Sequence, residues 1–304
     1  MKESIEQNYN ITLDYINDEN NNYSFKYKNE DYIFTFFNRG KNELDEIIKC
    51  NEELKKMNIK TLLFVPNKFN NIITTINETN YVLLHVPNNY KQEVDLTEII
   101  GNNKKLVLKH NYTNLYRNNW ANLWSEKLDY YEYQIRELGK DKDVILDTFG
   151  YYEAMAINAI SLINNNNYVF DEQKDKLTLS HRRIFFPNYK LNFYNPLNYI
   201  FDLEIRDIAE YIKTDFFYGT EAYLDLKTFL NSVRLSNYSY QMFYARLLYP
   251  SYYFDIYDKI MNKQKDQQEM LNIISKSQDY EMFLKKAYLE ISKYAKIDKI
   301  PWLS

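Results

Sequence analysis

The sequence has few residues of the types that build several common binding sites. Only five glycines occur among 304 residues, and none of them forms a Gly-x-Gly-x-x-Gly or Walker-type phosphate loop. The single cysteine, Cys50, excludes an intramolecular disulfide framework and a cysteine-based zinc site. Of the three histidines, His85 and His110 have no neighbouring pattern that predicts a metal site or a catalytic triad.

Charge and hydropathy exclude further classes of protein. The formal net charge of −4 lacks the basic footprint of a nucleic-acid-binding protein. The longest weakly charged stretch, Thr148 to Ile163, contains Glu153 and is too short to span a bilayer comfortably. The first ten residues are polar and show no apolar secretory segment. We therefore expect a cytoplasmic protein that binds no nucleic acid and has no membrane span.

Tyrosine, in contrast, is unusually abundant, with 31 residues. AT-rich coding is one explanation, because it favours Tyr together with Asn, Lys and Ile whatever the function. A surface built for assembly is the other, because Tyr offers rigid, amphipathic contact area. The sequence leaves both explanations open.

Alternating apolar and polar residues predict an antiparallel sheet in the first part of the chain. Residues 23–27 and 31–37 are typical of a hairpin, and residues 61–65, 72–76 and 81–86 of further strands. Leu44, Ile47, Ile48 and Leu54 predict a helix between them, with acidic residues in its first turn. The length of the chain suits two lobes, and Pro87 is the candidate hinge. We predict an N-lobe over residues 1–88 and a C-lobe over residues 89–304.

Apolar residues at helical spacing predict that the second part is mainly helical. Two long stripes run over residues 120–138 and 145–163. The short segment Ile300–Leu303 is predicted to dock on the body as an apolar tail. Further helices are predicted over residues 205–212, 221–234, 239–248, 253–260 and 280–294.

The segment 180–213 carries the pattern most suggestive of chemistry. An apolar run at residues 177–179 predicts a strand, followed by His181, a Pro- and Asn-rich loop and the helix that begins near Ile205. Protein kinases use this order for a His-x-Asp loop with the catalytic base, a metal-binding Asn five residues after the base, and a second metal-binding Asp. His181 and Asn188 keep the spacing, but Arg183 occupies the position of the base.

The predicted N-lobe lacks a second kinase feature. The third strand of a kinase carries a Lys that holds the nucleotide phosphates and pairs with a Glu on the following helix. Thr35 stands near that point, and residues 32–37 contain no lysine. Glu43 and Glu46 then lack their usual partner, unless Lys26 on the preceding strand reaches the same space. Lys26 and Asn188 are therefore the candidate nucleotide ligands.

Several pieces of the C-lobe sequence together carry a family resemblance. They are Trp124 with Lys127-Leu128-Asp129, residues 151–160, Ser180-His181-Arg182-Arg183, residues 201–210 with Arg206-Asp207-Ile208-Ala209-Glu210, and Ala245-Arg246-Leu247-Leu248-Tyr249-Pro250. This pattern resembles the CotS- and YutH-type spore-coat kinase-like proteins of the aminoglycoside and choline phosphotransferase superfamily, and the YutH-type branch most closely. The resemblance implies an α+β, protein-kinase-like bilobal fold. We expect a small, mostly antiparallel β N-lobe with one helix and a larger helical C-lobe.

The resemblance also implies roles for individual residues. The base of active relatives maps to Arg183, a permanent cation that cannot accept a proton at neutral pH. General-base assistance typically contributes about 10²–10⁴ in rate. By its distance from Arg206 and Asp207, the second metal ligand maps to Asn198, a neutral residue and a poor magnesium ligand. By its distance from Asn188, it maps to Asp202 instead.

Two other motif residues are expected to be structural. The resemblance implies that Asp207, at a helix start, accepts hydrogen bonds from the catalytic loop and fixes its shape. It implies that His181 is a buried residue of the same loop.

These observations favour a catalytically impaired pseudokinase with a structural or interaction role. The resemblance implies spore-coat association, coat proteins as partners and no cofactor. The alternative is an active phosphotransferase for a small hydroxyl acceptor, with ATP and magnesium as cofactors. That enzyme needs Asp202 and Asn188 as metal ligands and Glu204 as the base. A third hypothesis is nucleotide binding without transfer, with Arg183 as a phosphate clamp.

Overall fold

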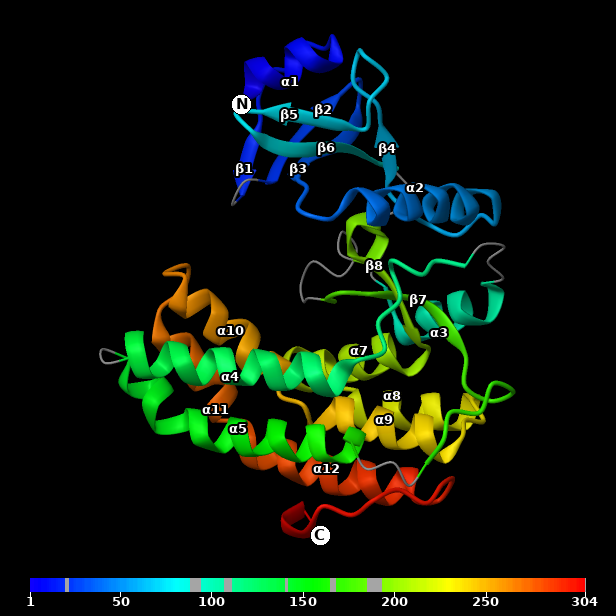
Figure 1. Ribbon diagram of the computed structural model, residues 1–304, viewed down its shortest axis with the longest axis vertical. Coiled ribbons are helices and arrows are strands. Elements are labelled where there is room, and N and C mark those ends of the chain that lie inside the picture. Colours follow the sequence, from blue (N-terminus) through cyan, green and yellow to red (C-terminus); the bar gives the residue numbers. More distant parts are fainter. Residues whose placement is uncertain are drawn as a thin grey trace. The chain divides into compact units, whose positions relative to one another are not determined.

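The computed structural model contains two compact units (Figure 1). It describes residues 1–19, 22–87, 94–106, 111–139, 142–164, 168–184 and 193–303. The first unit combines Met1–Asp95 with Lys105–Tyr116 and His181–Ile200. The second combines Leu96–Lys104, Arg117–Ser180 and Phe201–Ser304. The predicted boundary at residue 88 adjoins residues 88–93, which lie outside the described part, and it stays a prediction.

A six-stranded sheet forms the centre of the first unit. Its order is β1-β2-β3-β6-β4, and β5 also pairs with β6. Every pairing is antiparallel. Lys28 and Asn29, with φ angles of 50° and 64°, form the two-residue turn between β2 and β3, as a tight hairpin requires. The strands are β1 (Asn17–Glu19), β2 (Asn22–Tyr27), β3 (Glu30–Phe36), β4 (Leu63–Val65), β5 (Ile73–Ile76) and β6 (Thr79–Val86).

Helices α1 and α2 pack in the described part of this unit, and of these two only α2 was predicted. Helix α2 (Lys41–Lys56) buries Leu44, Ile47 and Leu54, as the spacing predicted. Helix α1 (Lys2–Tyr9) is mostly polar, but its Ile5 is fully buried in a cluster with strand residues that include Phe34. In Figure 1 the strands of the sheet lie between α1 and α2.

The second unit is a bundle of helices around α9. Every residue from Ser239 to Leu248 of α9 is buried, because α9 packs against α5, α7 and α12. A helix buried on all sides needs no polar face. The helices are α3 (Leu96–Lys105), α4 (Trp120–Leu138), α5 (Asp143–Asn164), α7 (Ile205–Tyr218), α8 (Ala222–Ser232), α9 (Asn237–Leu248), α10 (Ser251–Met261), α11 (Leu271–Ile274) and α12 (Ser277–Ile291). Short 3-10 helices are η2 (Pro196–Asn198) in the first unit, and η3 (Gln267–Met270) and η4 (Pro301–Leu303) in the second.

Strands β7 (Leu177–His181) and β8 (Tyr199–Leu203) form a separate two-stranded sheet. The prediction of a strand at residues 177–179 is confirmed, but the prediction of loop up to the helix at Ile205 was wrong for β8. Hydrogen bonds from the Arg182 N–H to the Asn198 carbonyl and from the Glu204 N–H to the Lys176 carbonyl close the ladder at its two ends. The apolar run Tyr199–Leu203, which follows the Asn-rich loop, pairs with β7 as a strand.

Many tyrosines lie in the interior. Tyr131, Tyr152, Tyr253, Tyr257 and Tyr280 of the helical unit are each at most 2% exposed. Their hydroxyl groups find partners there: the Tyr280 O–H donates to the Leu247 carbonyl at 2.6 Å. A substantial part of the tyrosine content therefore serves core packing.

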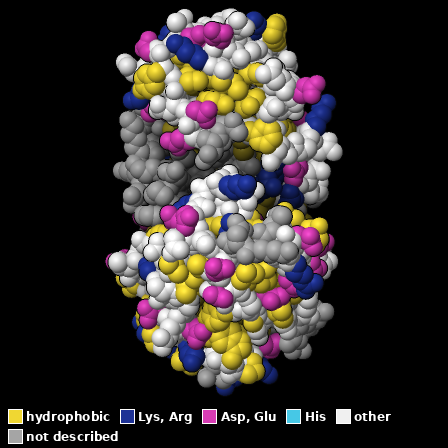
Figure 2. Space-filling view, turned by 90° about the vertical axis from the view of Figure 1, so that its left-hand side faces the viewer, with side chains coloured by type: hydrophobic (Ala, Val, Ile, Leu, Met, Phe, Trp, Pro, Cys, Tyr) yellow, Lys and Arg dark blue, Asp and Glu magenta, His cyan; other side chains and the backbone are white. Residues whose placement is uncertain are grey.

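The predicted architecture, an antiparallel sheet region followed by a larger helical region, is confirmed. The C-terminal tail docks through Ile300 and Leu303, both 4% exposed. Within the described ranges, none of the helices is long and apolar enough to cross a membrane. On the face in Figure 2, Lys and Arg side chains are scattered among Asp and Glu.

Candidate functional site

The kinase-motif segment of the first unit is anchored by backbone and aromatic contacts. The Leu62 N–H donates to the Tyr194 carbonyl at 2.9 Å, and the Tyr199 hydroxyl donates to Thr61 Oγ1 at 2.7 Å. The His181 ring is buried and stacks on Phe193 with ring centroids 4.4 Å apart. It also meets the edge of Tyr199 at 5.4 Å. The histidine at the start of the motif is therefore packed among aromatic rings.

Arg183, in the position of the base, is half-buried in this segment. Its Nη1 donates to the Arg182 carbonyl at 3.3 Å, and this hydrogen bond is exposed. A guanidinium group has no lone pair that can accept the proton of an acceptor hydroxyl. Asn188, the candidate metal and nucleotide ligand, lies outside the described residues.

Arg39, a buried cation of this site, is not among the residues that the sequence motifs indicated. The Arg39 Nε donates to Glu43 Oε2 at 3.0 Å. Its Nη1 donates to the carbonyl oxygens of Leu197 at 2.9 Å and of Tyr199 at 2.7 Å. The side chain is only 2% exposed. These two carbonyls flank Asn198, so an arginine is held beside the residue that the resemblance assigned to the second metal ligand.

A local signal for Arg39 was present in the sequence. Arg39 precedes Gly40, the N-cap of α2, and stands four residues before Glu43, a spacing typical of ion pairs at a helix start. Its contacts to residues 197 and 199, however, join segments about 160 positions apart, and no local pattern predicts them.

The remaining N-lobe candidates have partners on neighbouring strands or loops of the same unit. Thr35 Oγ1, at the expected position of the kinase lysine, donates to Asn22 Oδ1 at 2.5 Å. Lys26 is 59% exposed and lies 3.8 Å from Asp31. Glu46 accepts from the backbone N–H groups of Asn114 and Leu115 at 3.0 and 3.1 Å. Glu43 is paired with Arg39 and not with a strand lysine.

Asp202 of the second unit is buried between two arginines. Its Oδ2 accepts from Arg246 Nη2 at 2.7 Å and from Arg206 Nη1 at 3.3 Å. Its Oδ1 accepts from the Leu203 N–H at 2.7 Å. The three charged side chains are 3% exposed or less. Both guanidinium groups lie over the Trp120 ring, 4.2 and 4.5 Å from its centroid.

Arg206 of this cluster stays charged despite its burial. Burial, followed by repulsion from Arg246, lowers the pKa of Arg206 to about 10, so Arg206 remains charged at neutral pH. Two cations therefore share one carboxylate. Removing one partner of such a buried ion pair strongly destabilises the folded protein.

Helix α7 carries the other acidic motif residues. Asp207 lies in its first turn and is 3% exposed. Glu204 directly precedes the helix, and burial raises the pKa of its carboxyl group. Further along α7, Lys213 is buried. It donates to Glu210 Oε1 at 2.9 Å and to Ser251 Oγ at 2.7 Å. The second unit thus contains two buried charged networks on one helix.

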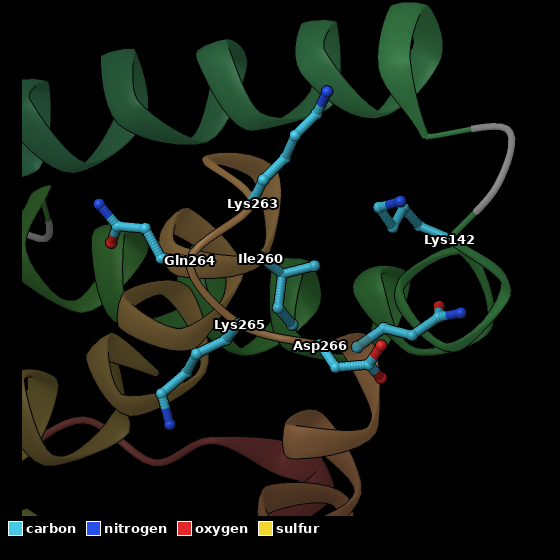
Figure 3. Close-up of a pocket in the computed structure, with 7 residues that line it drawn as sticks. Lys142, Ile260, Lys263, Gln264, Lys265 and Asp266 are labelled. Atoms are coloured by element: carbon cyan, nitrogen blue, oxygen red, sulfur yellow. The ribbon is translucent and has the colours of Figure 1, made fainter.

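Other candidate groups of the described chain do not form a reactive centre. Burial raises the pKa of the Cys50 thiol, which disfavours the thiolate. Among the residues described, no group of three or more His, Cys, Asp or Glu side chains could hold a metal ion. A pocket of about 440 Å³ beside the end of α10 is lined by Lys142, Lys263 and Lys265. Figure 3 shows that these lysines do not converge on one point.

Comparison with known proteins identifies both the fold and the family. The fold is similar to an aminoglycoside phosphotransferase from Alicyclobacillus acidocaldarius, with a TM-score of 0.61, 12% identity and coverage of 96% of this chain and 97% of that chain. It is also similar to the amicoumacin kinase hAmiN (TM-score 0.54, 11% identity, 97% and 94% coverage). Spectinomycin phosphotransferase APH(9)-Ia gives a TM-score of 0.52 at 11% identity, with 96% and 92% coverage. The expected kinase-like, aminoglycoside phosphotransferase-like fold is therefore confirmed.

Sequence comparison supports the family resemblance. Over 209 residues the chain is 26% identical to the endospore coat-associated protein YutH of Bacillus subtilis (strain 168). That match covers 60% of this chain and 61% of the relative, so it spans less than two thirds of the relative's length. Residues 2–287 match the sequence model of the family described as "Spore coat putative kinase YutH". The chain therefore belongs to the YutH family of spore-coat kinase-like proteins.

Proposed function

We propose that this protein is a catalytically impaired kinase-like protein with a structural or interaction role in the spore coat. The observation that carries the proposal is the burial of Asp202 between Arg206 and Arg246. The chemistry of an active enzyme would need this carboxylate to face a magnesium ion. Withdrawing it from both arginines would leave two buried cations without their shared partner, which is energetically costly.

The contacts of Arg39 support the same proposal. An arginine bound to the carbonyls of residues 197 and 199 brings a fixed positive charge to Asn198. Magnesium is held by negatively charged or strongly dipolar oxygen ligands. Asn198 is neutral, and the carbonyl oxygens beside it already accept hydrogen bonds from a cation. The described residues therefore fit magnesium poorly.

Arg183 adds a third argument, because it removes the proton acceptor of the reaction. The loss of a general base alone would lower the rate by about 10²–10⁴. The proposed role is then one of binding to other proteins, and the likeness to the coat-associated relative suggests coat proteins as partners.

An active small-molecule phosphotransferase is the second candidate. The likeness to solved antibiotic phosphotransferases over nearly the whole chain favours it. Glu204 would serve as the base, and the raised pKa of its carboxyl group gives it a higher proton affinity than an exposed Glu. This candidate requires Asp202 to leave both arginines and bind magnesium together with Asn188.

A thermal-shift titration with ATP separates these candidates. Ligands that bind only the folded state raise the melting temperature by mass action, and a ligand at 100 times its Kd stabilises by about 2.7 kcal/mol. We expect no magnesium-dependent shift at millimolar ATP. A shift that requires magnesium would contradict the proposal and place Asp202 in a metal site. A shift with ATP in EDTA would instead indicate phosphate binding by arginine without transfer.

The location can be tested independently of catalysis. We expect antibodies against the protein to detect it in the coat extract of spores of the source organism. Recovery only from the soluble fraction of vegetative cells would contradict the coat assignment and leave a cytoplasmic role.

A further inference from the structure

A second pocket lies in the helical unit, away from the residues of the kinase motif. It has a volume of about 390 Å³ and is open to solvent between the end of α7, the start of α8 and the first turns of α12. Its lining includes Asp215, Phe216, Tyr223, Asp279, Phe283 and Lys286. None of the residues discussed for catalysis or metal binding lines it.

Aromatic rings form one wall of this pocket, and they are held in place. The rings of Phe216 and Phe283 pack with centroids 5.3 Å apart, and Phe283 is buried. The Tyr223 hydroxyl donates to Glu290 Oε1 at 2.8 Å, which fixes its ring against α12. The faces of such rings attract cations.

The chain itself shows this attraction. The Nζ atoms of Lys227 and Lys286 lie 5.8 and 5.9 Å from the centroid of the Tyr223 ring. Lys286 also lines the pocket, so a cation of the protein already stands at its rim.

Two carboxylates add negative charge to the lining. Asp215 Oδ2 accepts from the Glu221 N–H at 2.7 Å. A Cβ at position 219 would lie 1.7 Å from Asp215 Oδ1, so Gly219 leaves room for this carboxylate in its present position. Asp279 stands in the first turn of α12 and is exposed. The fixed carboxylate of Asp215 and the exposed one of Asp279 make the pocket complementary to a cation.

Large apolar side chains are exposed around the opening. Met282 is 48% exposed and Tyr223 is 39% exposed, and both line the pocket. Met and Tyr are enriched at protein interfaces, where aromatic and flexible apolar groups surround a buried anchor. The rim therefore suits a polypeptide more than a small hydrophilic ion.

We propose that this pocket binds an arginine side chain of a partner polypeptide, with flanking apolar residues on the rim. A planar guanidinium group can stack on an aromatic ring and donate to a carboxylate at the same time, whereas an ammonium group is a hydrated point charge. In the free protein, the ammonium group of Lys286 competes with such a guanidinium group, because it is attracted by the same carboxylates and the same Tyr223 ring. The proposal goes beyond the proposed coat role and does not depend on whether the kinase motif is active.

The first test compares two peptides that differ only in charge. Acetyl-Leu-Arg-Leu-amide and its citrulline analogue have nearly the same shape, but citrulline is neutral. Binding to the full chain is followed through the methyl resonance of Met282, assigned with the Met282→Leu variant. We expect the arginine peptide to bind about three- to thirty-fold more tightly, from one charge pair and one cation–π contact. Equal affinity for both peptides, or no shift of the Met282 resonance, would overturn the proposal.

Three variants sharpen this test. Asp279→Asn should weaken binding of the arginine peptide about two- to five-fold without changing that of the citrulline peptide. Lys286→Gln should strengthen it by a similar factor, because a competing cation is removed. Lys285→Gln, at an exposed neighbouring position outside the pocket lining, is the matched control and should change nothing.

Circular dichroism shows whether each variant is folded, and an unaltered affinity in a folded Asp279→Asn variant would refute the assignment. The outcome is independent of the ATP titration, which reports on the kinase motif. Failure of one proposal therefore does not imply failure of the other.

Discussion

The two units differ in the groups that contact their buried charged side chains. In the sheet unit, the buried Arg39 donates through Nε and Nη1 to a single carboxylate and two backbone carbonyls. The helical unit buries two arginines on one aspartate and a lysine on a second network. Backbone carbonyls are dipoles that stay in place when a side chain changes, whereas a buried carboxylate is a full charge. The helical unit should therefore be the more sensitive to the loss of one charged side chain.

The largest expected effect comes from Asp202→Asn in the helical unit. This change removes the carboxylate that two buried guanidinium groups share, and we expect the free energy of unfolding to fall by about 3–5 kcal/mol. Urea denaturation followed by circular dichroism measures this difference. Asp279→Asn, an exposed change of the same type, should cost less than about 1 kcal/mol. Comparable losses in the free energy of unfolding of the two variants would show that the buried Asp202 cluster does not make the helical unit sensitive to the loss of a charge.

A smaller effect is expected from Arg39→Met in the sheet unit. The methionine fills part of the volume, but three hydrogen bonds of a charged donor are lost, and removing charged hydrogen-bond partners typically costs about 1.5–3 kcal/mol. Urea denaturation again gives the value. Arg39→Lys keeps the charge without the planar fork and should recover only part of the stability. A loss larger than that of Asp202→Asn would reverse the ranking of the two units.

The smallest effect concerns a pair of like charges between α4 and α5. Burial, and then the hydrogen bond with Glu132, raise the pKa of Glu153 to about 7. Because the folded state holds this proton more tightly than the unfolded chain, the contribution to stability is present at low pH. It is lost as the pH rises towards and through 7.

Glu153→Gln should therefore reduce the fall in melting temperature between pH 5.5 and pH 7.5. Differential scanning calorimetry at both pH values measures it. Glu269→Gln, at an exposed position paired with Lys265, is the control and should keep the slope of the unsubstituted protein. An unchanged slope in Glu153→Gln would show that Glu153 does not titrate in this range.

The sequence predicted those parts of the fold that depend on local periodicity. The spacing of Leu44, Ile47 and Leu54 matches one face of a helix and predicted α2. The apolar stripes over residues 120–138 and 145–163 predicted α4 and α5. Helix α1 was missed because a single apolar residue, Ile5, anchors an otherwise polar segment. Strand β8 was missed because its strand state comes from pairing with β7.

The candidate site was predictable only where a motif keeps its spacing along the chain. Arg183 and Asp207 were found in this way, and the roles assigned to them stay predictions. The partners of Arg39 and Asp202 come from segments far apart in the sequence, so only the folded chain reveals them. For tyrosine, composition suggested two causes, and packing in the core is a third that composition alone could not show.

The arginine contacts at residue 198 also have an evolutionary consequence. If the proposed loss of catalysis is correct, a return to phosphotransfer needs an acid at position 183, an acid at position 198 and the removal of Arg39 from the carbonyls beside it. A change at position 39 alone lowers folding stability and does not restore activity. A change at position 183 alone restores a base but no metal site. Under selection for a stable scaffold, the change at position 39 is therefore disfavoured before activity can return. The contacts of Arg39 would then oppose an evolutionary return of this protein to phosphotransfer.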